Sequence, residues 1–160
     1  MRVGILTVSD KSSKGEREDL SGKTIRETVA ADFYEYTIVP DELDKIAATI
    51  KEFVDQKKCD VVFTTGGTGL SFRDVTPEAT RQVIDREIPG MAEVMRQESY
   101  KIKKTAILSR AVAGHRWKSL VINLPGSPKA VKECLDIILP VIPHALEILA
   151  KGSAECGSLR

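Results

Sequence analysis

Three glycines and an aspartate near the middle of the chain have the types and spacing needed to bind a phosphate. Gly66, Gly67 and Gly69 lie in the segment Thr-Thr-Gly-Gly-Thr-Gly, and Asp74 follows shortly after it. Because glycine has no β-carbon, the backbone there can adopt positive φ angles, and its N–H groups can approach an anion closely. Mg²⁺ binds through one or two carboxylates together with substrate phosphates. The pattern therefore favours a magnesium–phosphate site with Asp74 as a metal ligand.

The same residues also fit a purely structural turn. The segment is not followed by Gly-Lys-Ser or Gly-Lys-Thr, and it lacks the Gly-x-Gly-x-x-Gly spacing of dinucleotide-binding loops. A tight connection between a strand and a helix would use glycines as well. Asp74 could form an Asx turn ahead of Thr76 and Pro77, which have the types expected for a helix cap and a first helical residue. The turn alone leaves anion binding and simple chain reversal open.

Other polar residues follow the strands that the sequence predicts. These strands are apolar and rich in β-branched residues, and they cover residues 3–8, 36–39, 59–65 and 120–124. Ser9 and Asp10 follow the first strand and Asp41 follows the second. Asn123 lies at the end of the fourth, beside the turn 125–127. Ligands of open parallel sheets bind outside the carboxyl ends of the strands, so these side chains could converge with the glycines on one rim.

Each of these polar residues has an ordinary structural alternative. Asp41 stands at the start of an amphipathic segment and could be a helix N-cap, while Asn123 could simply stabilise its turn. Asp41 and Asp74 could instead hold one metal or position an attacking phosphate. Three arginines could each meet an anion: Arg73, Arg110 and Arg116. Arg116 fits a solvated surface charge best.

Helical segments alternate with the predicted strands. Helices are expected over residues 20–31, from 41 to about 54, over 77–85 and 91–101, and over 131–150 with breaks at Pro140 and Pro143. Ser21 and Ser127 are candidate helix caps. The alternation predicts an α/β fold with a parallel sheet, formed by one domain over residues 1–151. Residues 152–160 are expected to form a flexible tail.

Charge and cysteine content narrow the function classes. The 160-residue chain has 24 Lys and Arg against 23 Asp and Glu, without the basic excess that binding to nucleic acid or an anionic membrane would need. Its apolar start is too short for a signal-peptide core or a spanning helix. Cys59, Cys134 and Cys156 form no Cys-x-x-Cys pair, which suits the cytoplasm and predicts that the first two are buried core residues.

Taken together, four motifs resemble the MogA/MoaB family and the similar G domains of gephyrin and plant Cnx. They are Thr-Thr-Gly-Gly-Thr-Gly at 64–69, Arg-Asp-Val-Thr-Pro-Glu-Ala at 73–79, Ala-Ile-Leu-Ser-Arg at 106–110 and Ile-Asn-Leu-Pro-Gly-Ser-Pro at 122–128. The resemblance extends from about residue 3 to residue 149. It implies a three-layer α/β/α fold with a mostly parallel central sheet, which forms a homotrimer in the family.

The resemblance also implies a reaction and a set of site residues. Family members transfer the adenylyl group of Mg-ATP to molybdopterin and release pyrophosphate, before hand-over to a molybdate-insertion protein. The family's essential aspartates match Asp41 and Asp74, which would act in catalysis and in binding Mg²⁺. Pterin contacts match Thr68, Ser99, Ser109 and Asn123, and the nucleotide phosphate loop matches Gly66, Gly67 and Gly69. Ser9 and Asp10 match the family's first loop less specifically.

One departure from the pattern leaves a second function open. The long insertion that some bacterial MogA proteins carry after the Leu-Pro-Gly-x-Pro helix is missing, so the chain is more similar to MoaB and the eukaryotic G domains. Some MoaB proteins are described as lacking adenylyl transfer. The alternative is therefore a non-catalytic protein that binds a pterin or assists assembly on the same fold.

Overall fold

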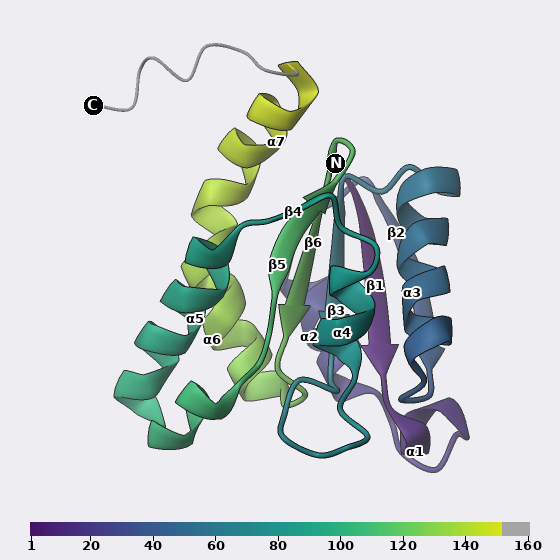
Figure 1. Ribbon diagram of the computed structural model, residues 1–160, viewed down its shortest axis with the longest axis vertical. Coiled ribbons are helices and arrows are strands. Elements are labelled where there is room, and N and C mark those ends of the chain that lie inside the picture. Colours follow the sequence, from purple (N-terminus) through teal and green to yellow (C-terminus); the bar gives the residue numbers. More distant parts are fainter. Residues whose placement is uncertain (152–160) are drawn as a thin grey trace.

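A six-stranded sheet runs through the computed structural model, which describes residues 1–151 (Figure 1). The strands are β1 (Arg2–Val8), β2 (Phe33–Val39), β3 (Val61–Thr65), β4 (Arg86–Glu87), β5 (Ala113–Arg116) and β6 (Ser119–Leu124). Their order across the sheet is β2-β1-β3-β6-β5-β4. The first four strands in this order pair in parallel, whereas β5 and β4 pair antiparallel. The expected tail at 152–160 lies outside the described residues.

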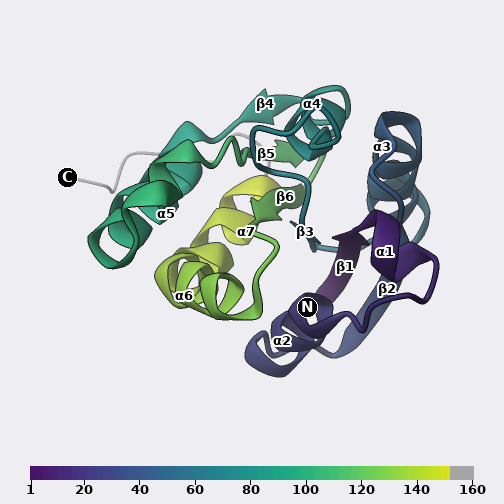
Figure 2. The same ribbon diagram turned by 90° about the horizontal axis from the view of Figure 1, so that it is seen from below.

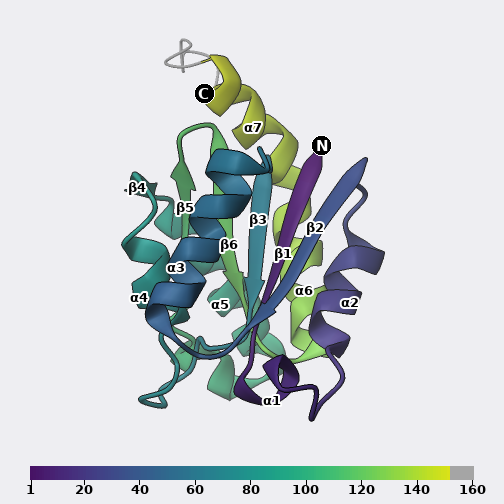
Figure 3. The same ribbon diagram turned by 90° about the vertical axis from the view of Figure 1, so that its right-hand side faces the viewer.

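Helices cover both faces of the sheet. The α-helices are α1 (Asp10–Ser13), α2 (Leu20–Thr28), α3 (Leu43–Lys51), α4 (Thr76–Arg81), α5 (Pro89–Ile102), α6 (Pro128–Ile138) and α7 (Ile142–Lys151). A π-helical turn η1 (Glu52–Gln56) and two 3₁₀ turns, η2 (Lys104–Leu108) and η3 (Leu139–Val141), extend them. In Figures 2 and 3, α2, α5, α6 and α7 lie on one face and α3 and α4 on the other. The predicted three-layer α/β/α fold is confirmed.

The apolar central strands explain why both faces are covered. Every residue of β3 and β6 is buried, and β1 is buried from Val3 onward. Strands with two apolar faces need helices on both sides, and two separate core clusters fill these layers. Phe63 and Ile122 belong to the cluster under α2, α5, α6 and α7, and Val62 and Val121 to the one under α3 and α4.

The antiparallel edge was not predicted. β5 has the sequence Ala-Gly-His-Arg without a β-branched residue, and β4 has only two residues, so neither has the pattern of a buried strand. The structure joins β5 to β6 through the two-residue loop Trp117–Lys118. A two-residue loop is typical of a hairpin, but Trp-Lys contains none of the Gly, Asn or Asp residues that mark such a turn in a sequence.

Two of the predicted helix caps are wrong and one is confirmed. Asp19, rather than Ser21, accepts the N–H of Gly22 at the start of α2. The helix α4 begins at Thr76 itself, so that residue does not cap it. Ser127 accepts the N–H of Ala130 and caps α6, as predicted. The predicted break near Pro140 is also confirmed, since η3 separates α6 from α7.

The strand order places the loops after β1 and β3 side by side. The chain moves outward from β1 to β2 on one side, and β3 pairs on the other side of β1. A reversal of this kind leaves a crevice at the carboxyl ends of the two central strands, where ligands of α/β sheets bind. These ends lie at the bottom of Figure 1, near α1. Among residues 1–151, no helix has the length and apolar character needed to cross a bilayer.

Candidate functional site

Two adjoining pockets lie at the carboxyl ends of the strands. The smaller, which we call the carboxylate pocket, has a volume of about 250 Å³, and Asp41, Asp74, Gly66 and Gly67 line part of it. The larger, which we call the helix pocket, has a volume of about 440 Å³ and is bounded by α5, η2 and α6. Gly126 lines both pockets. The loop after β6 therefore forms part of the wall between them.

The loop after β6 is fixed against the glycine-rich segment. Thr65 Oγ1 donates to Pro125 O at 2.7 Å, and Ser21 Oγ donates to Gly126 O at 2.8 Å. A β-carbon on Gly126 would lie 3.4 Å from the Cα of Gly66, so the two backbones approach closely. This contact brings the ends of β3 and β6 together between the pockets.

Positive φ angles at two glycines shape the floor of the carboxylate pocket. Gly66 has φ +97° and Gly67 has φ +64°, a region that side chains rarely adopt. A β-carbon would lie 2.3 Å from Val8 O at Gly66 and 2.3 Å from Thr76 Oγ1 at Gly67. Thr76 Oγ1 in turn donates to Gly66 O at 2.9 Å. The turn requires glycine at both positions, because the φ angles are positive and protein atoms lie where a β-carbon would be.

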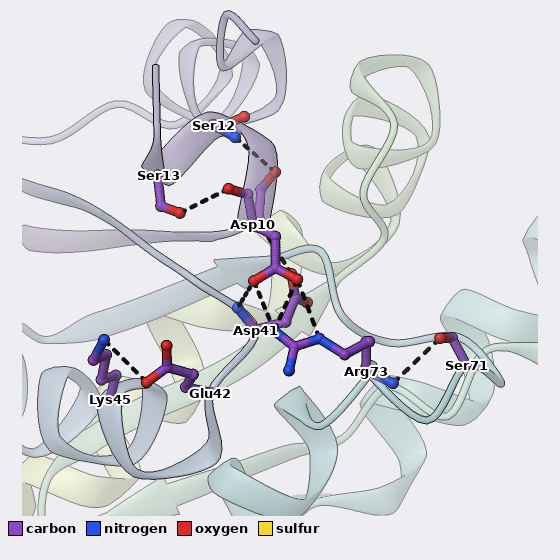
Figure 4. Close-up of polar contacts among 9 residues, drawn as sticks. Asp10, Ser12, Ser13, Asp41, Glu42, Lys45, Ser71 and Arg73 are labelled. Carbon is purple, nitrogen blue, oxygen red and sulfur yellow. Dashed lines mark hydrogen bonds and ion pairs between the residues drawn. The ribbon is translucent and has the colours of Figure 1, made fainter. Parts of the chain in front are cut away.

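Asp41 and Asp10 bind each other's backbone across the ends of β1 and β2 (Figure 4). The N–H of Asp10 donates to Asp41 Oδ2 at 2.9 Å, and the N–H of Asp41 donates to Asp10 Oδ1 at 3.1 Å. Arg73 then donates to both carboxylate oxygens of Asp10, at 2.8 Å each. Asp41 is not a helix N-cap, because α3 begins at Leu43 and its cap position is Glu42. It is fixed by the reciprocal contact with Asp10.

The surroundings shift the pKa values of Asp41 and Asp10 in opposite directions. Burial raises the pKa of the Asp41 carboxyl above its usual value, and the negative charges of Asp10 and Asp74 act in the same direction. The hydrogen bond from Arg73 lowers the pKa of Asp10. Asp10 is therefore neutralised by a protein cation, whereas Asp41 is a carboxylate whose charge would be stabilised by a bound cation.

Asp74 lines the same pocket from the opposite side. Its Oδ2 accepts the N–H of Ser71 at 2.9 Å, and its own N–H donates to Ser71 O at 2.9 Å. The carboxylate thus accepts a bond from a preceding residue, which differs from the Asx turn considered for it. A β-carbon on Gly69 would lie 2.9 Å from Asp74 Oδ2, so the last glycine gives this carboxylate its room.

The carboxylate pair suits a magnesium ion that is shared with substrate. Among residues 1–151, no three His, Cys, Asp or Glu side chains gather closely enough to hold a metal by themselves. Mg²⁺ does not need such a cage, since it usually takes one or two carboxylates, substrate phosphates and water. Asp41 and Asp74 line one pocket with the open glycine backbone. Their charge and placement fit the donor set that Mg²⁺ prefers.

The helix pocket combines an apolar wall with a few polar groups. Ala92 and Met95 from α5, together with Leu108 from η2, contribute apolar surface. The polar residues of the lining include Thr68, Arg96, Ser99, Lys103, Ser109, Asn123 and Glu133. A mostly apolar cavity with several separate polar groups is typical of a site for a small organic molecule.

Asn123 has its side-chain amide committed to the protein. The amide is fully buried, and its Nδ2 donates to Thr64 Oγ1 at 2.9 Å and to Thr80 Oγ1 at 2.8 Å. Its Oδ1 accepts the N–H of Val112 at 3.1 Å. Both N–H donors are therefore used between β3, α4 and the segment before β5. Asn123 shapes the pocket wall rather than offering a free donor to a ligand.

The structure brings the other predicted residues to one of the two pockets. Ser9, Asp41, Gly66, Gly67 and Asp74 line the carboxylate pocket, while Thr68, Gly69, Ser99 and Ser109 line the helix pocket. Asp10 does not line the carboxylate pocket, but it forms hydrogen bonds with Asp41, which does. The sequence interpretation missed Arg17, Glu18 and Asp19, which reach the carboxylate pocket from the segment before α2. The N-cap role of Asp19 was the available signal for that segment.

All three candidate arginines are paired within the protein. Arg73 pairs with Asp10, Arg110 with Glu78 and Arg116 with Asp55. The expectation of a solvated Arg116 is wrong, because its side chain is 19% exposed and also donates to Val83 O at 3.0 Å. The two cysteines expected in the core are buried, and Cys134 lies beside Ser99 in the helix pocket wall.

Comparison with known proteins assigns this chain to a class. A family model described as a probable molybdopterin binding domain matches residues 4–144. A molybdopterin adenylyltransferase of Helicobacter pylori is 48% identical over 155 residues, covering 93% of this chain and 88% of that protein. The pockets and fold thus define a protein of the molybdopterin-binding class.

Solved structures agree with this assignment. The molybdopterin biosynthesis enzyme MoaB of Thermus thermophilus is 49% identical and covers 94% of this chain and 96% of its own, with a TM-score of 0.86. The tungsten cofactor synthesizing protein MoaB of Pyrococcus furiosus is 40% identical and covers 91% of this chain and 94% of its own, with a TM-score of 0.84. The chain belongs to the molybdopterin-binding family that includes the MogA and MoaB proteins, and the predicted family is confirmed.

Proposed function

We propose that this protein transfers the adenylyl group of Mg-ATP to molybdopterin and releases pyrophosphate. The observation that carries the proposal is the pair of adjoining pockets, one with two carboxylates and an open glycine backbone, the other mostly apolar. The triphosphate group of a nucleoside triphosphate fits the chemistry of the carboxylate pocket, and a pterin fits that of the helix pocket. Gly126 lies in both walls, so substrates in the two pockets would meet beside it.

Relatives support both the enzyme class and the pathway. The predicted enzyme class is confirmed by the curated relatives, which carry the name molybdopterin adenylyltransferase at 48% identity in Helicobacter pylori. A role in synthesis of the molybdenum cofactor follows from the same relatives. The use of Mg-ATP and the release of pyrophosphate rest on the carboxylate pocket and on the family resemblance.

In the carboxylate pocket, the chain would bind and orient the triphosphate. The backbone around Gly66 and Gly67 lines this pocket and would contact phosphate oxygens through N–H groups other than that of Gly66, which donates to Leu124 O at 3.3 Å. Asp41 and Asp74 would hold Mg²⁺, which would neutralise the charge that develops on the phosphates. A phosphate oxygen of molybdopterin would then attack the α-phosphorus, and the bond from this phosphorus to the pyrophosphate oxygen would break.

In the helix pocket, the chain would hold the pterin against the apolar wall. Thr68, Ser99 and Ser109 offer hydroxyl groups to its polar atoms. Asn123 would act through its neighbours, because its amide fixes the wall by bonds to Thr64 and Thr80. Holding two substrates in fixed positions can supply much of the rate of a transfer reaction, because the reacting atoms no longer have to find each other.

A non-catalytic pterin-binding protein is the second candidate. It rests on the family resemblance, because the insertion that some bacterial MogA proteins carry after the Leu-Pro-Gly-x-Pro helix is missing from this chain. This function would need the helix pocket but not the carboxylate pocket. Retention of Asp41 and Asp74 in one lining favours the enzyme.

A product assay with a matched variant tests the proposal. The purified protein is incubated with molybdopterin, ATP and Mg²⁺, and adenylylated molybdopterin is measured by mass spectrometry. Asp74→Asn should lower the rate by about 100-fold or more, since lost stabilisation of transition-state charge costs about 3 kcal/mol. Molybdopterin binding should persist in this variant. Pterin binding without product by the wild type would support the non-catalytic candidate instead.

Assembly and hand-over are further parts of the proposal. The family resemblance supports a homotrimer that passes its product to a molybdate-insertion protein in the cytoplasm. Sedimentation of the purified protein would report the trimer, with a monomer in the presence of both substrates as the contrary result.

A further inference from the structure

The loop that carries Asp74, residues 69–75, makes few apolar contacts with the rest of the protein. Leu70 is 67% exposed, and Phe72 is fully exposed at its tip. Val75 at the end of the loop is the one apolar side chain of residues 69–75 that packs against a core cluster. The rest of the loop depends on polar contacts for a defined shape. One such contact is the exposed pair between Arg73 and Asp10, which solvent weakens. The loop therefore needs another anchor if Asp74 is to stay in the carboxylate pocket.

Arg110 supplies this anchor at both ends of the loop. Its Nε donates to Gly69 O at 2.7 Å, and its Nη2 donates to Asp74 O at 2.6 Å. Its own backbone N–H donates to Thr68 O at 2.9 Å. The planar guanidinium can direct several N–H groups at once, which an ammonium group cannot do in the same geometry.

The guanidinium is itself held by a carboxylate on α4. Arg110 forms an ion pair with Glu78, in which Nη2 lies 3.3 Å from Glu78 Oε2. Glu78 belongs to the first turn of α4, directly after the loop, and the Arg110 side chain is 35% exposed. Loop and helix are thus joined to the segment before β5 through one side chain. That segment includes Ser109, which lines the helix pocket.

From these contacts we infer that Arg110 is a positioning residue for Asp74, and that it sets the affinity of the carboxylate pocket for a divalent cation bound with nucleotide. Arg110 lines neither pocket and acts through the loop backbone. The cation and nucleotide parts of this inference rest on the proposed function. The effect on the loop itself does not.

The test compares Arg110→Lys with Arg116→Lys. Arg116 is a matched control, because it also pairs with a carboxylate, Asp55, and donates to a backbone carbonyl. It lies at the end of β5 and pairs with Ser119 at the start of β6, so it is at the opposite end of the strands from the pockets. Both variants keep the charge and lose the guanidinium fork. A merely structural effect should therefore be similar in the two proteins.

Two readouts separate positioning from general destabilisation. Hydrogen exchange of the ligand-free proteins should show amides of residues 69–75 exchanging about tenfold faster in Arg110→Lys and unchanged in Arg116→Lys. Electron paramagnetic resonance of Mn²⁺ with a non-hydrolysable ATP analogue should show about tenfold weaker Mn²⁺ binding in Arg110→Lys alone. If Arg110→Lys does not fold, Glu78→Gln should change both readouts in the same direction.

Each outcome decides the inference. Unchanged hydrogen exchange of residues 69–75 in Arg110→Lys would overturn it. Faster exchange of these residues with unchanged Mn²⁺ affinity would also overturn it. Equal effects of the two arginine variants on Mn²⁺ binding would also contradict it. If the wild type does not bind Mn²⁺ with the nucleotide analogue, the proposed function and the cation part of the inference fail, while the exchange data still decide whether Arg110 holds the loop.

Discussion

Asp41 is a residue whose charge is costly to the fold and useful to the proposed reaction. Burial raises the pKa of its carboxyl, and Asp10 and Asp74 add to this effect. A raised pKa means that the folded protein holds the proton more tightly than the unfolded chain. The stability that Asp41 gains from protonation is fully present below about pH 3.8, the usual pKa of Asp, and is lost as the pH rises through the folded value.

Asp41→Asn is therefore expected to raise the free energy of unfolding at pH 7 while it abolishes catalysis. The gain should be about 0.5–1 kcal/mol, as for other residues retained for function at some cost in stability. It should decrease as the pH falls toward 4, because Asp41 itself then becomes neutral. Urea denaturation at both pH values measures the difference. A variant less stable than the wild type at pH 7 and equally so at pH 4 would contradict the explanation.

Residue types and spacing predicted part of the site, and the reasons for the rest are physical. Asp74 and the glycines were identified because open backbone and a nearby carboxylate are local features of the sequence. The contact between Asp10 and Asp41 joins residues 31 apart, and the amide of Asn123 reaches Thr64 across 59 positions. Such pairs depend on strand order, which local patterns do not contain.

At the scale of elements, the turn after β3 has the most restrictive geometry in the site. Gly67→Ala should lower the free energy of unfolding by about 2 kcal/mol or more, since it combines a positive φ with a β-carbon 2.3 Å from Thr76 Oγ1. Gly90→Ala is the control, because a β-carbon there meets open space in the first turn of α5. It should stabilise by about 0.5 kcal/mol. Thermal unfolding of both variants checks the pair, and equal effects would refute the requirement.

The hairpin between β5 and β6 contains a non-glycine residue with a positive φ angle. Trp117 has φ +51° and is 70% exposed, so its side chain contributes little packing to offset the backbone cost. Trp117→Asn should raise the free energy of unfolding by about 0.5–1 kcal/mol, because Asn tolerates this conformation better. Lys118→Asn serves as the control at a neighbouring position without positive φ. Circular dichroism is the suitable probe, since the chain has one Trp.

Burial decides which strands could be predicted from the sequence. β1, β3 and β6 are mostly apolar and lie buried between helices on both faces of the sheet, and this gives the strong local pattern that identified them. β4 and β5 are short edge strands, and their pairing is set by the hairpin and by contacts with distant residues. Their sequences carry few of the features that distinguish a strand.

At the scale of the whole molecule, the strand order explains why the two pockets adjoin. The loops after β1, β2 and β3 form the carboxylate pocket at the point where the order reverses. The loop after β6 then separates it from the helix pocket under α5 and α6. Substrates of different chemistry can thus bind at one sheet edge with their reacting ends adjacent. In the proposed reaction, a nucleotide and a pterin are joined at this end of the sheet.

The position of a phosphate label tests that claim most directly. The protein is incubated with molybdopterin, Mg²⁺ and ATP that carries ³²P at either the α- or the γ-phosphate, and the pterin is separated from the nucleotides. The pterin product should carry label from α-labelled ATP and none from γ-labelled ATP, whose label should appear in pyrophosphate. Bound molybdopterin that acquires no label from either form, or acquires it from the γ-phosphate, would contradict adenylyl transfer.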